Sequence, residues 1–319
     1  MLTSQNSSVD LLILGGGWTY TFLKPLLDSD EHRHKITYMA TTRDGRDGTL
    51  RWSWDSEDDR NNDYDALPTA KTVVVVFPLK GKHKSRKLVE GYEQCHGKDV
   101  RWIQLGSTGI FDGGPTLKSQ QPLSEKFEMA KANFKWTDCH SPYNVDNDRA
   151  IAEDELLSLR ENAFVLNLCG LWGGQRDPAN WFGRIAPSKE ALAAKGSVHF
   201  VHGHDVARAI VAVHEAPPVA LTSQTLDMGR NKHLKGRRYV VTDLRVYDWW
   251  DIASAWAASS ANDLAAKDAG QWVLELMQEH DIRALPRTPQ EIGRAMDSRE
   301  FWETFKLTPS KGRWERARA

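Results

Sequence analysis

Short apolar runs alternate along this chain with longer segments whose apolar residues recur at helical spacing. The apolar runs lie at Val9–Leu14, Lys35–Ala40, Thr72–Phe77, Val100–Leu105, Ala163–Leu168, Val198–Val201 and Arg238–Thr242. Several of them are continuous and rich in β-branched residues, as in the four valines at positions 73–76. Continuous runs of this kind predict strands that are buried on both faces, as in a parallel sheet.

The segments between these runs predict helices. They lie at Thr19–Leu27, Ser85–His96, Arg149–Leu159, Val206–Glu215 and Tyr247–Ala258, with short helices over Trp272–Phe305. We expect Asp146 or Asn147 to cap the helix at Arg149, and Asp205 to cap the helix at Val206. Strands that alternate with helices in this way predict an α/β fold built on a Rossmann-type, doubly wound parallel sheet.

The order of these segments also bears on domain organisation. No linker divides the chain, so we expect one Rossmann-like, nucleotide-binding domain over residues 1–319. Its C-terminal part, about residues 170–319, is expected to contribute a small substrate lobe that is interleaved with the core in sequence.

Composition narrows the class of protein. Of 319 residues, 40% are hydrophobic and 27% are charged, and the net charge of −1 gives no basic field for nucleic acid. No apolar run approaches the roughly 20 residues that span a bilayer, and residues 1–10 lack the pattern of a signal peptide. Cys95, Cys139 and Cys169 are far apart, which suits a reducing compartment and matches neither a disulfide framework nor a zinc spacing. We therefore expect a cytoplasmic protein that binds neither nucleic acid nor a membrane.

A glycine turn, Gly15-Gly16-Gly17-Trp18, follows the first predicted strand. In the register Gly-x-Gly-x-x-Gly, Gly15 and Gly17 fit, and Tyr20 stands in place of the third glycine. Glycine lets a pyrophosphate approach the backbone closely, and the free N–H groups of a helix start bind such an anion. The turn is therefore a candidate dinucleotide site, with an ordinary tight turn as the alternative.

Five landmarks in the sequence carry a resemblance to a known family. They are Gly15–Trp18, Thr41–Arg43, Ser107–Phe111, Leu168–Gly174 and His202–Ala209. In this order, from Val9 to Trp250, the chain resembles the extended short-chain dehydrogenase/reductase superfamily, in its NAD-dependent epimerase/dehydratase branch. It is most similar to the atypical members, which open with Gly-x-Gly-Trp. The resemblance implies a cofactor along the carboxyl ends of the strands, a small-molecule substrate between core and lobe, and a homodimer.

The end of the second predicted strand bears on the choice of cofactor. No acidic residue occurs at positions 40–43 to hold the ribose 2′-hydroxyl of NAD. Arg43 instead offers a planar cation suited to the 2′-phosphate of NADP, with the hydroxyl of Thr42 beside it. We therefore predict NADP, and the adjacent Asp44 keeps NAD open. The resemblance places three further residues along the nucleotide, namely Trp18, Phe77 and Pro78.

The resemblance also says which catalytic groups to expect. The family uses a Ser or Thr after the middle strand, together with a Tyr-x-x-x-Lys pair on a helix. Ser107 stands at the serine position. The pair is missing, because Arg149 falls at the lysine position and Val145 at the tyrosine position. Tyr143 lies two residues before the tyrosine position.

Three interpretations of this catalytic pattern stay open. In the first, Tyr143 acts as the acid beside Arg149, because a phenol with a pKa of ~10 needs a nearby cation to work at neutral pH. In the second, another group does different chemistry, the candidates being Ser107, Asp112 and His202. In the third, the site binds nucleotide without turnover.

Three more residues are expected at the substrate, namely Thr108, Arg176 and His202. Thr108 neighbours the candidate serine, Arg176 follows a loop that faces the substrate in the resembling family, and His202 occupies that family's His-x-x-Asp turn. The segment around His202 also contains His199, His204 and Asp205, whose side chains can act as metal ligands. Because Asp205 is needed as a helix cap, no metal site is predicted.

Together these features predict an NADP-binding oxidoreductase that transfers hydride between a nicotinamide and the carbonyl or alcohol carbon of a small molecule. Two alternatives stay open. One is a non-catalytic regulator that senses NAD(P) and binds a protein partner. The other is an epimerase or lyase with a tightly bound cofactor.

Overall fold

A seven-stranded parallel sheet forms the centre of the computed structural model, which describes residues 8–57, 62–112, 134–217, 234–257 and 264–312. Its strand order is β3-β2-β1-β4-β5-β7-β11, and every neighbouring pair is parallel. The strands are β1 (Ser8–Leu14), β2 (Tyr38–Thr42), β3 (Leu50–Arg51), β4 (Thr69–Val75), β5 (Arg101–Ser107), β7 (Ala163–Leu168) and β11 (Arg237–Val241). The order reverses direction between β1 and β4, which is where ligands bind in open sheets of this type.

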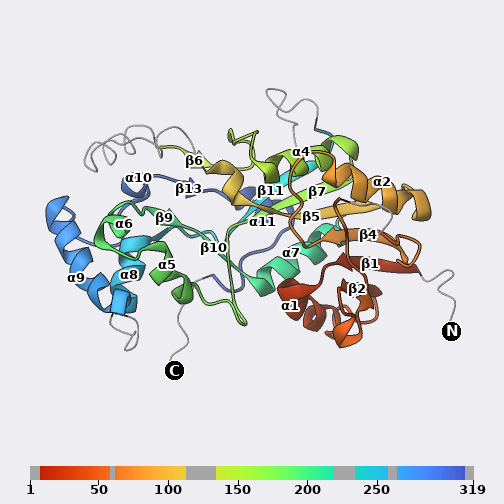
Figure 1. Ribbon diagram of the computed structural model, residues 1–319, viewed down its shortest axis with the longest axis horizontal. Coiled ribbons are helices and arrows are strands. Elements are labelled where there is room, and N and C mark those ends of the chain that lie inside the picture. Colours follow the sequence, from red (N-terminus) through yellow and green to blue (C-terminus); the bar gives the residue numbers. More distant parts are fainter. Residues whose placement is uncertain (1–7, 58–61, 113–133, 218–233, 258–263, 313–319) are drawn as a thin grey trace.

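Two pairs of helices cover the two faces of this sheet (Figure 1). They are α1 (Gly17–Leu27) with α7 (Gly203–Glu215), and α2 (Lys84–His96) with α4 (Asp148–Leu159). The valine run shows how the strands separate two cores: Val74 packs in the cluster that includes Leu23 of α1, whereas Val73 packs in the cluster that includes Leu88 of α2. Because both faces are covered, continuous apolar strands are favourable, and the predicted Rossmann-type α/β fold is confirmed.

A third apolar cluster forms a separate lobe, and Figure 1 shows its helices gathered at one end of the molecule. Its elements are α5 (Phe182–Ile185), α6 (Lys189–Ala193), α8 (Trp249–Ala257), α9 (Leu264–Glu279) and the antiparallel pair β9 (Ser197–Val198) and β12 (Tyr247–Asp248). Inside it, Arg287 makes a fully buried ion pair with Asp248 at 2.6 Å and lies 3.7 Å above the ring of Trp250. Removing one partner of such a pair leaves an uncompensated buried charge.

Several shorter elements complete the fold. They are β6 (Trp136–Thr137), β8 (Gly170–Trp172), β10 (Phe200–His202), β13 (Ala295–Met296), α10 (Pro289–Ile292), α11 (Arg299–Thr304) and the 3₁₀ turns η1 (Arg46–Gly48), η3 (Thr108–Phe111) and η5 (Pro178–Trp181). After the lobe the chain returns to the core through α11, where Trp302 donates its indole N–H to the carbonyl of Thr242 at 3.0 Å. The core and the lobe are thus interleaved in sequence.

Several predicted boundaries differ from the structure. The cap of α4 is Asn147, one of the two predicted candidates, and its side chain accepts the N–H of Arg149. The predicted cap Asp205 is wrong, because α7 begins at Gly203 and is capped by His202. The second strand lies at β2, slightly later than predicted, and the segment predicted as short helices from Trp272 includes much of the 16-residue helix α9. Among the described residues, no helix has the length and apolar character needed to cross a bilayer.

Candidate functional site

The glycine turn lies between the ends of β1 and β2 and is tied to β2 by two hydrogen bonds. Gly15 donates its N–H to the hydroxyl of Thr41 at 3.0 Å, and Gly16 donates to the Thr41 carbonyl at 2.8 Å. Gly15 and Gly17 have φ values of +81° and +47°, a region that favours glycine. The turn therefore has a fixed shape that glycine adopts without strain at both positions.

The part of the turn that remains open to a ligand is the start of α1. A Cβ built on Gly17 meets nothing within 4 Å. The first helical turn contains the N–H groups of Gly17, Trp18 and Thr19, which have no carbonyl partners within the helix. Among the described residues, none of these N–H groups donates a hydrogen bond. Free N–H groups and open space at a helix start suit a pyrophosphate, so the residues present fit a dinucleotide.

At Gly15 a neighbouring aromatic ring is a second constraint that favours glycine. A Cβ on Gly15 would lie 2.8 Å from the ring of Phe77, which lies just beyond β4. Phe77 in turn stacks on Trp54, with ring centroids 5.7 Å apart and planes 17° apart. Pro78 is exposed next to it. Phe77 and the glycine turn are therefore brought together, and Trp54 is an aromatic neighbour that sequence reasoning did not select.

Thr42 and Arg43 at the end of β2 have opposite environments. The buried hydroxyl of Thr42 is used internally, because it contacts the Thr49 hydroxyl at 2.6 Å and accepts the N–H of Gly45 at 2.9 Å. Arg43 is exposed and makes no ion pair with any residue that the structure describes. Asp44, the residue that kept NAD open, pairs with Arg46 at 3.0 Å. The guanidinium of Arg43 is thus available to an external anion.

A second loop lies against the glycine turn. The indole N–H of Trp18 donates to the carbonyl of Gly173 at 2.9 Å, and the guanidinium of Arg176 lies 4.5 Å from the Trp18 ring centroid. Gly173 and Arg176 also exchange two backbone hydrogen bonds, at 2.9 and 3.1 Å, which close the loop into a tight turn. Arg176, predicted at the substrate, therefore lies beside the start of α1.

His202 packs behind this loop. Its ring is 4.5 Å from the ring of Trp172 and 5.2 Å from that of Phe22, measured between centroids. Its Nδ1 accepts the N–H of His204 at 3.0 Å, which makes it the cap of α7. Burial lowers the pKa of His202, so the neutral ring is favoured. His202 therefore lies near Trp18, because the ring of Phe22 contacts both, and His202 caps α7.

Ser107 ends β5 at the same edge of the sheet. Its hydroxyl accepts the N–H of Gly109 at 3.1 Å, which leaves the hydroxyl proton available to donate. The hydroxyl of Thr108 instead points into the fold, where it is buried and donates to the carbonyl of Leu168 at 3.3 Å. Asp112, the third polar residue of this segment, forms an ion pair with Arg294.

A buried polar network holds the main chain of Ser107. Glu153 of α4 accepts the N–H of Ser107 at 3.1 Å and the amide of Asn167 at 2.8 Å, and it is ion-paired with Arg238. Asn167 also donates to the Ser107 carbonyl at 3.1 Å. Glycine is required at position 106, because a Cβ there would lie 2.7 Å from the Glu153 carboxylate. Such a network fixes a main-chain position only when every member is paired.

Tyr143 and Arg149 are not brought together in the way the first interpretation requires. The hydroxyl of Tyr143 donates to Asp154 at 2.8 Å, and the cation over its ring is Arg238, at 4.8 Å. Burial raises the pKa of Tyr143 well above its usual value. Arg149 donates to the carbonyl of Leu105 at 2.8 Å, between α4 and β5. The cation beside Tyr143 is therefore Arg238, which sequence reasoning did not select.

The sequence contains one indication of the buried network of Glu153, Asn167 and Arg238. Asn167 is a polar residue inside the otherwise apolar strand Ala163–Leu168, and a buried amide needs partners. Its partners, Glu153 and Arg238, lie on other elements, so their pairing depended on the tertiary fold.

The fold has known counterparts among solved structures. Three similar ones are RMD from Pseudomonas aeruginosa complexed with NADPH (13% identity, 94% of each chain covered, TM-score 0.55), vestitone reductase from alfalfa, Medicago sativa (15% identity, 95% of this chain and 94% of that chain, TM-score 0.53), and UDP-glucose 4-epimerase from Thermus thermophilus in complex with NAD (13% identity, 94% of each chain, TM-score 0.51). At these identities the likeness establishes the fold alone, which is a Rossmann-type fold. No protein-family model and no curated protein matches the chain.

Proposed function

We propose that this chain binds NADP(H) at the carboxyl edge of its sheet and is an oxidoreductase acting on a small carbonyl or alcohol compound. The observation that carries the proposal is the glycine turn between β1 and β2, where three N–H groups at the start of α1 have no partner among the described residues and Gly17 faces open space. Such a start binds the pyrophosphate of a dinucleotide.

The preference for NADP rests on Arg43. An exposed guanidinium without an ion pair among the described residues offers a two-pronged set of donors to a 2′-phosphate. Its neighbour Asp44 is held by Arg46, so the carboxylate is less available to a ribose hydroxyl. The similar structures carry NADPH in one case and NAD in another, so the fold itself allows both cofactors.

The cofactor supplies hydride when it is bound, and the protein supplies binding and orientation. Ser107 is the candidate orienting group, because its hydroxyl proton is free to bond a substrate oxygen while its main chain is held by Glu153 and Asn167. Arg176 is a candidate for the anionic part of a ligand, because it is exposed beside the start of α1.

A second candidate function is a nucleotide-binding regulator without turnover. The observation that favours it is the engagement of the two groups of the first interpretation: Tyr143 is bonded to Asp154, and Arg149 is bonded to the carbonyl of Leu105. The phenol proton of Tyr143 is then used within the protein, and Arg149 is directed at the main chain of β5. An epimerase or lyase with a tightly bound cofactor would use the same site.

The test is a comparison of turnover with binding. Purified protein is screened for oxidation of NADPH in the presence of aldehydes and ketones, and Ser107→Ala is compared with Ser158→Ala, a control serine on α4. We expect Ser107→Ala to abolish turnover and to leave NADPH affinity within about twofold, because the serine contacts substrate rather than cofactor. Turnover that survives in Ser107→Ala would exclude this role, and NADPH binding without turnover of any substrate would favour the regulator.

A further inference from the structure

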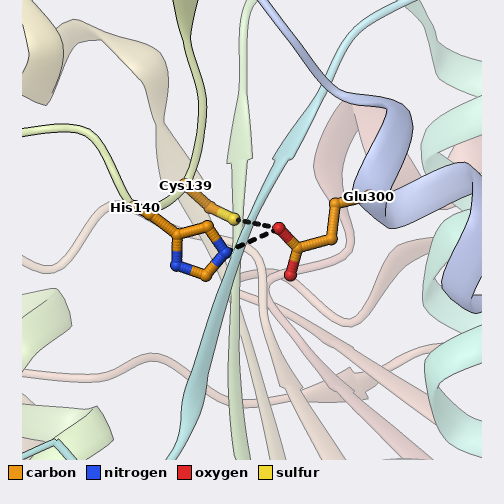
Figure 2. Close-up of side chains that lie close together, drawn as sticks. All are labelled: Cys139, His140 and Glu300. Carbon is orange, nitrogen blue, oxygen red and sulfur yellow. Dashed lines mark hydrogen bonds and ion pairs between the residues drawn. The ribbon is translucent and has the colours of Figure 1, made fainter. Parts of the chain in front are cut away.

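One group of metal-ligand side chains lies apart from the glycine turn. Among the residues that the structure describes, the thiol of Cys139, the imidazole of His140 and the carboxylate of Glu300 have ligand atoms that all lie within 4.8 Å of one another. Figure 2 shows the cysteine and histidine reaching from one loop toward the glutamate on α11. Both meet the same carboxylate oxygen, Oε2 of Glu300, at 3.1 Å from Sγ and 2.7 Å from Nε2.

The backbone explains how residues 160 positions apart meet. Strand β6 pairs in parallel with β13, so that Thr137 lies opposite Met296, and Asp297 donates its N–H to the carbonyl of Thr137 at 2.8 Å. Cys139 lies just after β6, and Glu300 lies in the first turn of the helix that follows β13. The small two-stranded sheet therefore sets the distance between the loop and the helix.

The loop itself is held in shape before any ligand is present. The carboxylate of Asp138 accepts the N–H of His140 at 3.0 Å and the hydroxyl of Ser141 at 2.8 Å. The Ser141 hydroxyl accepts the N–H of Asp138 at 3.0 Å, and the Ser141 N–H donates to the Asp138 carbonyl at 3.3 Å. This turn directs two consecutive side chains, Cys139 and His140, to the same side. A ligand would thus cost the protein little conformational entropy when it binds.

The three side chains differ in how far they are exposed to solvent. Cys139 is buried against Val240 and Met296, whereas the side chains of His140 and Glu300 are 46% and 27% exposed. The exposed parts of His140 and Glu300 give an ion a route to the cluster from the solvent.

We propose that Cys139, His140 and Glu300 form a binding site for a zinc-class divalent cation, with water as the fourth ligand. Thiolate, imidazole and carboxylate are the three ligand types that zinc takes from proteins. In a tetrahedral zinc site the ligand atoms lie about 3.3–3.8 Å apart, so the glutamate must withdraw by about 0.5–1 Å from its present contacts. Its partly exposed side chain allows that movement.

Binding releases the thiol proton of Cys139 to solvent, because the thiolate is the species that coordinates. The ion then joins the loop after β6 to α11, and so fastens this part of the chain to the core. The site does not depend on the proposed oxidoreductase function, since it shares no residue with the glycine turn or with Ser107.

The site is tested with Zn²⁺ and Co²⁺ on the full chain. We expect one Zn²⁺ per chain after dialysis, a thiolate-to-cobalt charge-transfer band with Co²⁺, and a rise in Tm with Zn²⁺. Cys139→Ser should remove the charge-transfer band and weaken Zn²⁺ binding by at least ~10-fold, the lower limit seen even for outer-shell changes.

Matched controls keep the result interpretable. Cys95→Ser changes an exposed cysteine far from the site, and Glu303→Gln changes an exposed glutamate on the same helix, so both should bind Zn²⁺ like the natural chain. His140→Gln alters a side chain at the surface and should weaken binding without unfolding the protein. Absence of the cobalt band, or equal Zn²⁺ affinity in the natural chain, Cys139→Ser and His140→Gln, would show a hydrogen-bonded cluster with no metal function and would overturn the proposal.

Discussion

The guanidinium of Arg176 lies 4.5 Å from the ring centroid of Trp18, although 157 residues separate the two in the chain. The contact joins the loop after β8 to the first turn of α1. Trp18 strengthens it through its indole N–H bond to the Gly173 carbonyl. A flexible cation is thereby held beside the N–H groups that we assign to the pyrophosphate, so the loop and the glycine turn form one site.

This contact predicts the effect of two substitutions. Arg176→Ala removes a cation next to the proposed pyrophosphate and should weaken NADPH binding by about 10-fold, as expected for one charge-assisted hydrogen bond. Trp18→Phe keeps a ring under Arg176 and loses the bond to Gly173, so it should have a smaller effect. Affinities from fluorescence titration test this order. Equal affinity in Arg176→Ala and the natural chain would place Arg176 outside the cofactor site.

We predict that Arg43 determines the preference for NADPH over NADH. Arg43→Ala should weaken NADPH binding by about 10- to 100-fold and leave NADH binding nearly unchanged, because only NADPH carries the 2′-phosphate. Arg86→Ala is the control, since this exposed arginine lies on α2 and is paired with Glu90. The measurement is a parallel titration with both cofactors. Similar losses for NADPH and NADH would mean that Arg43 does not read the 2′-phosphate.

The network beneath Ser107 makes a prediction about stability. Arg238→Met removes the cation paired with fully buried Glu153 and should lower the free energy of unfolding by about 3–5 kcal/mol. Adding Glu153→Leu to the same chain should recover part of that loss, because the uncompensated carboxylate is then gone. Urea denaturation of the single and double variants measures both changes. A double variant less stable than Arg238→Met alone would contradict this explanation.

Asp243, just beyond the end of β11, predicts a dependence of stability on pH. Burial raises its pKa from 3.8 to about 7, although the Tyr247 hydroxyl donates to it at 2.5 Å. A carboxyl group with a raised folded-state pKa holds its proton in the native state, so its contribution to stability is lost as pH rises from its unfolded pKa through its folded pKa. From about pH 5 to pH 8, the natural chain should lose on the order of 2 kcal/mol relative to Asp243→Asn. Urea denaturation across this pH range measures the difference.

The control for this pH effect is Asp205, another buried carboxylate. Hydrogen bonds from Ser310 and Lys311 lower its pKa despite burial, so it stays ionised throughout this range. The difference between the natural chain and Asp205→Asn should therefore be flat from pH 5 to pH 8. A flat profile for Asp243→Asn as well would show that Asp243 is ionised in the native state at pH 5.

The sequence could predict six of the seven strands of the sheet because each of these has a local signal, whereas β3, which is only two residues long, was not predicted. The three valines of β4 and the apolar run of β7 are explained by burial on both faces of the sheet. The glycine turn is explained by the positive φ of Gly15 and Gly17. The cap of α7 could not be predicted from local chemistry, because Asp205 is a better capping residue in isolation. In the fold its carboxylate is taken by Ser310 and Arg208, so His202 caps the helix instead.

The candidate site was predictable only where its residues follow a strand. Gly17, Arg43 and Ser107 were predicted in this way, since each comes just after or at the end of a parallel strand. Trp54, Arg238 and the Cys139–Glu300 cluster were not found, because their partners are supplied by distant elements. Cysteine spacing in particular gives no sign of a metal site whose third ligand comes from a helix far along the chain.

The most direct test of the central claim is a titration of the natural chain with NADPH and with NADH, followed by quenching of tryptophan fluorescence and by energy transfer to the nicotinamide. Trp18 lies at the start of α1, so a bound dinucleotide should quench it. Gly17→Val is the control, because a side chain at φ +47° is strained and would occupy the open space. The account predicts saturable binding that is tighter for NADPH and lost in Gly17→Val. No saturable signal with either cofactor would contradict it.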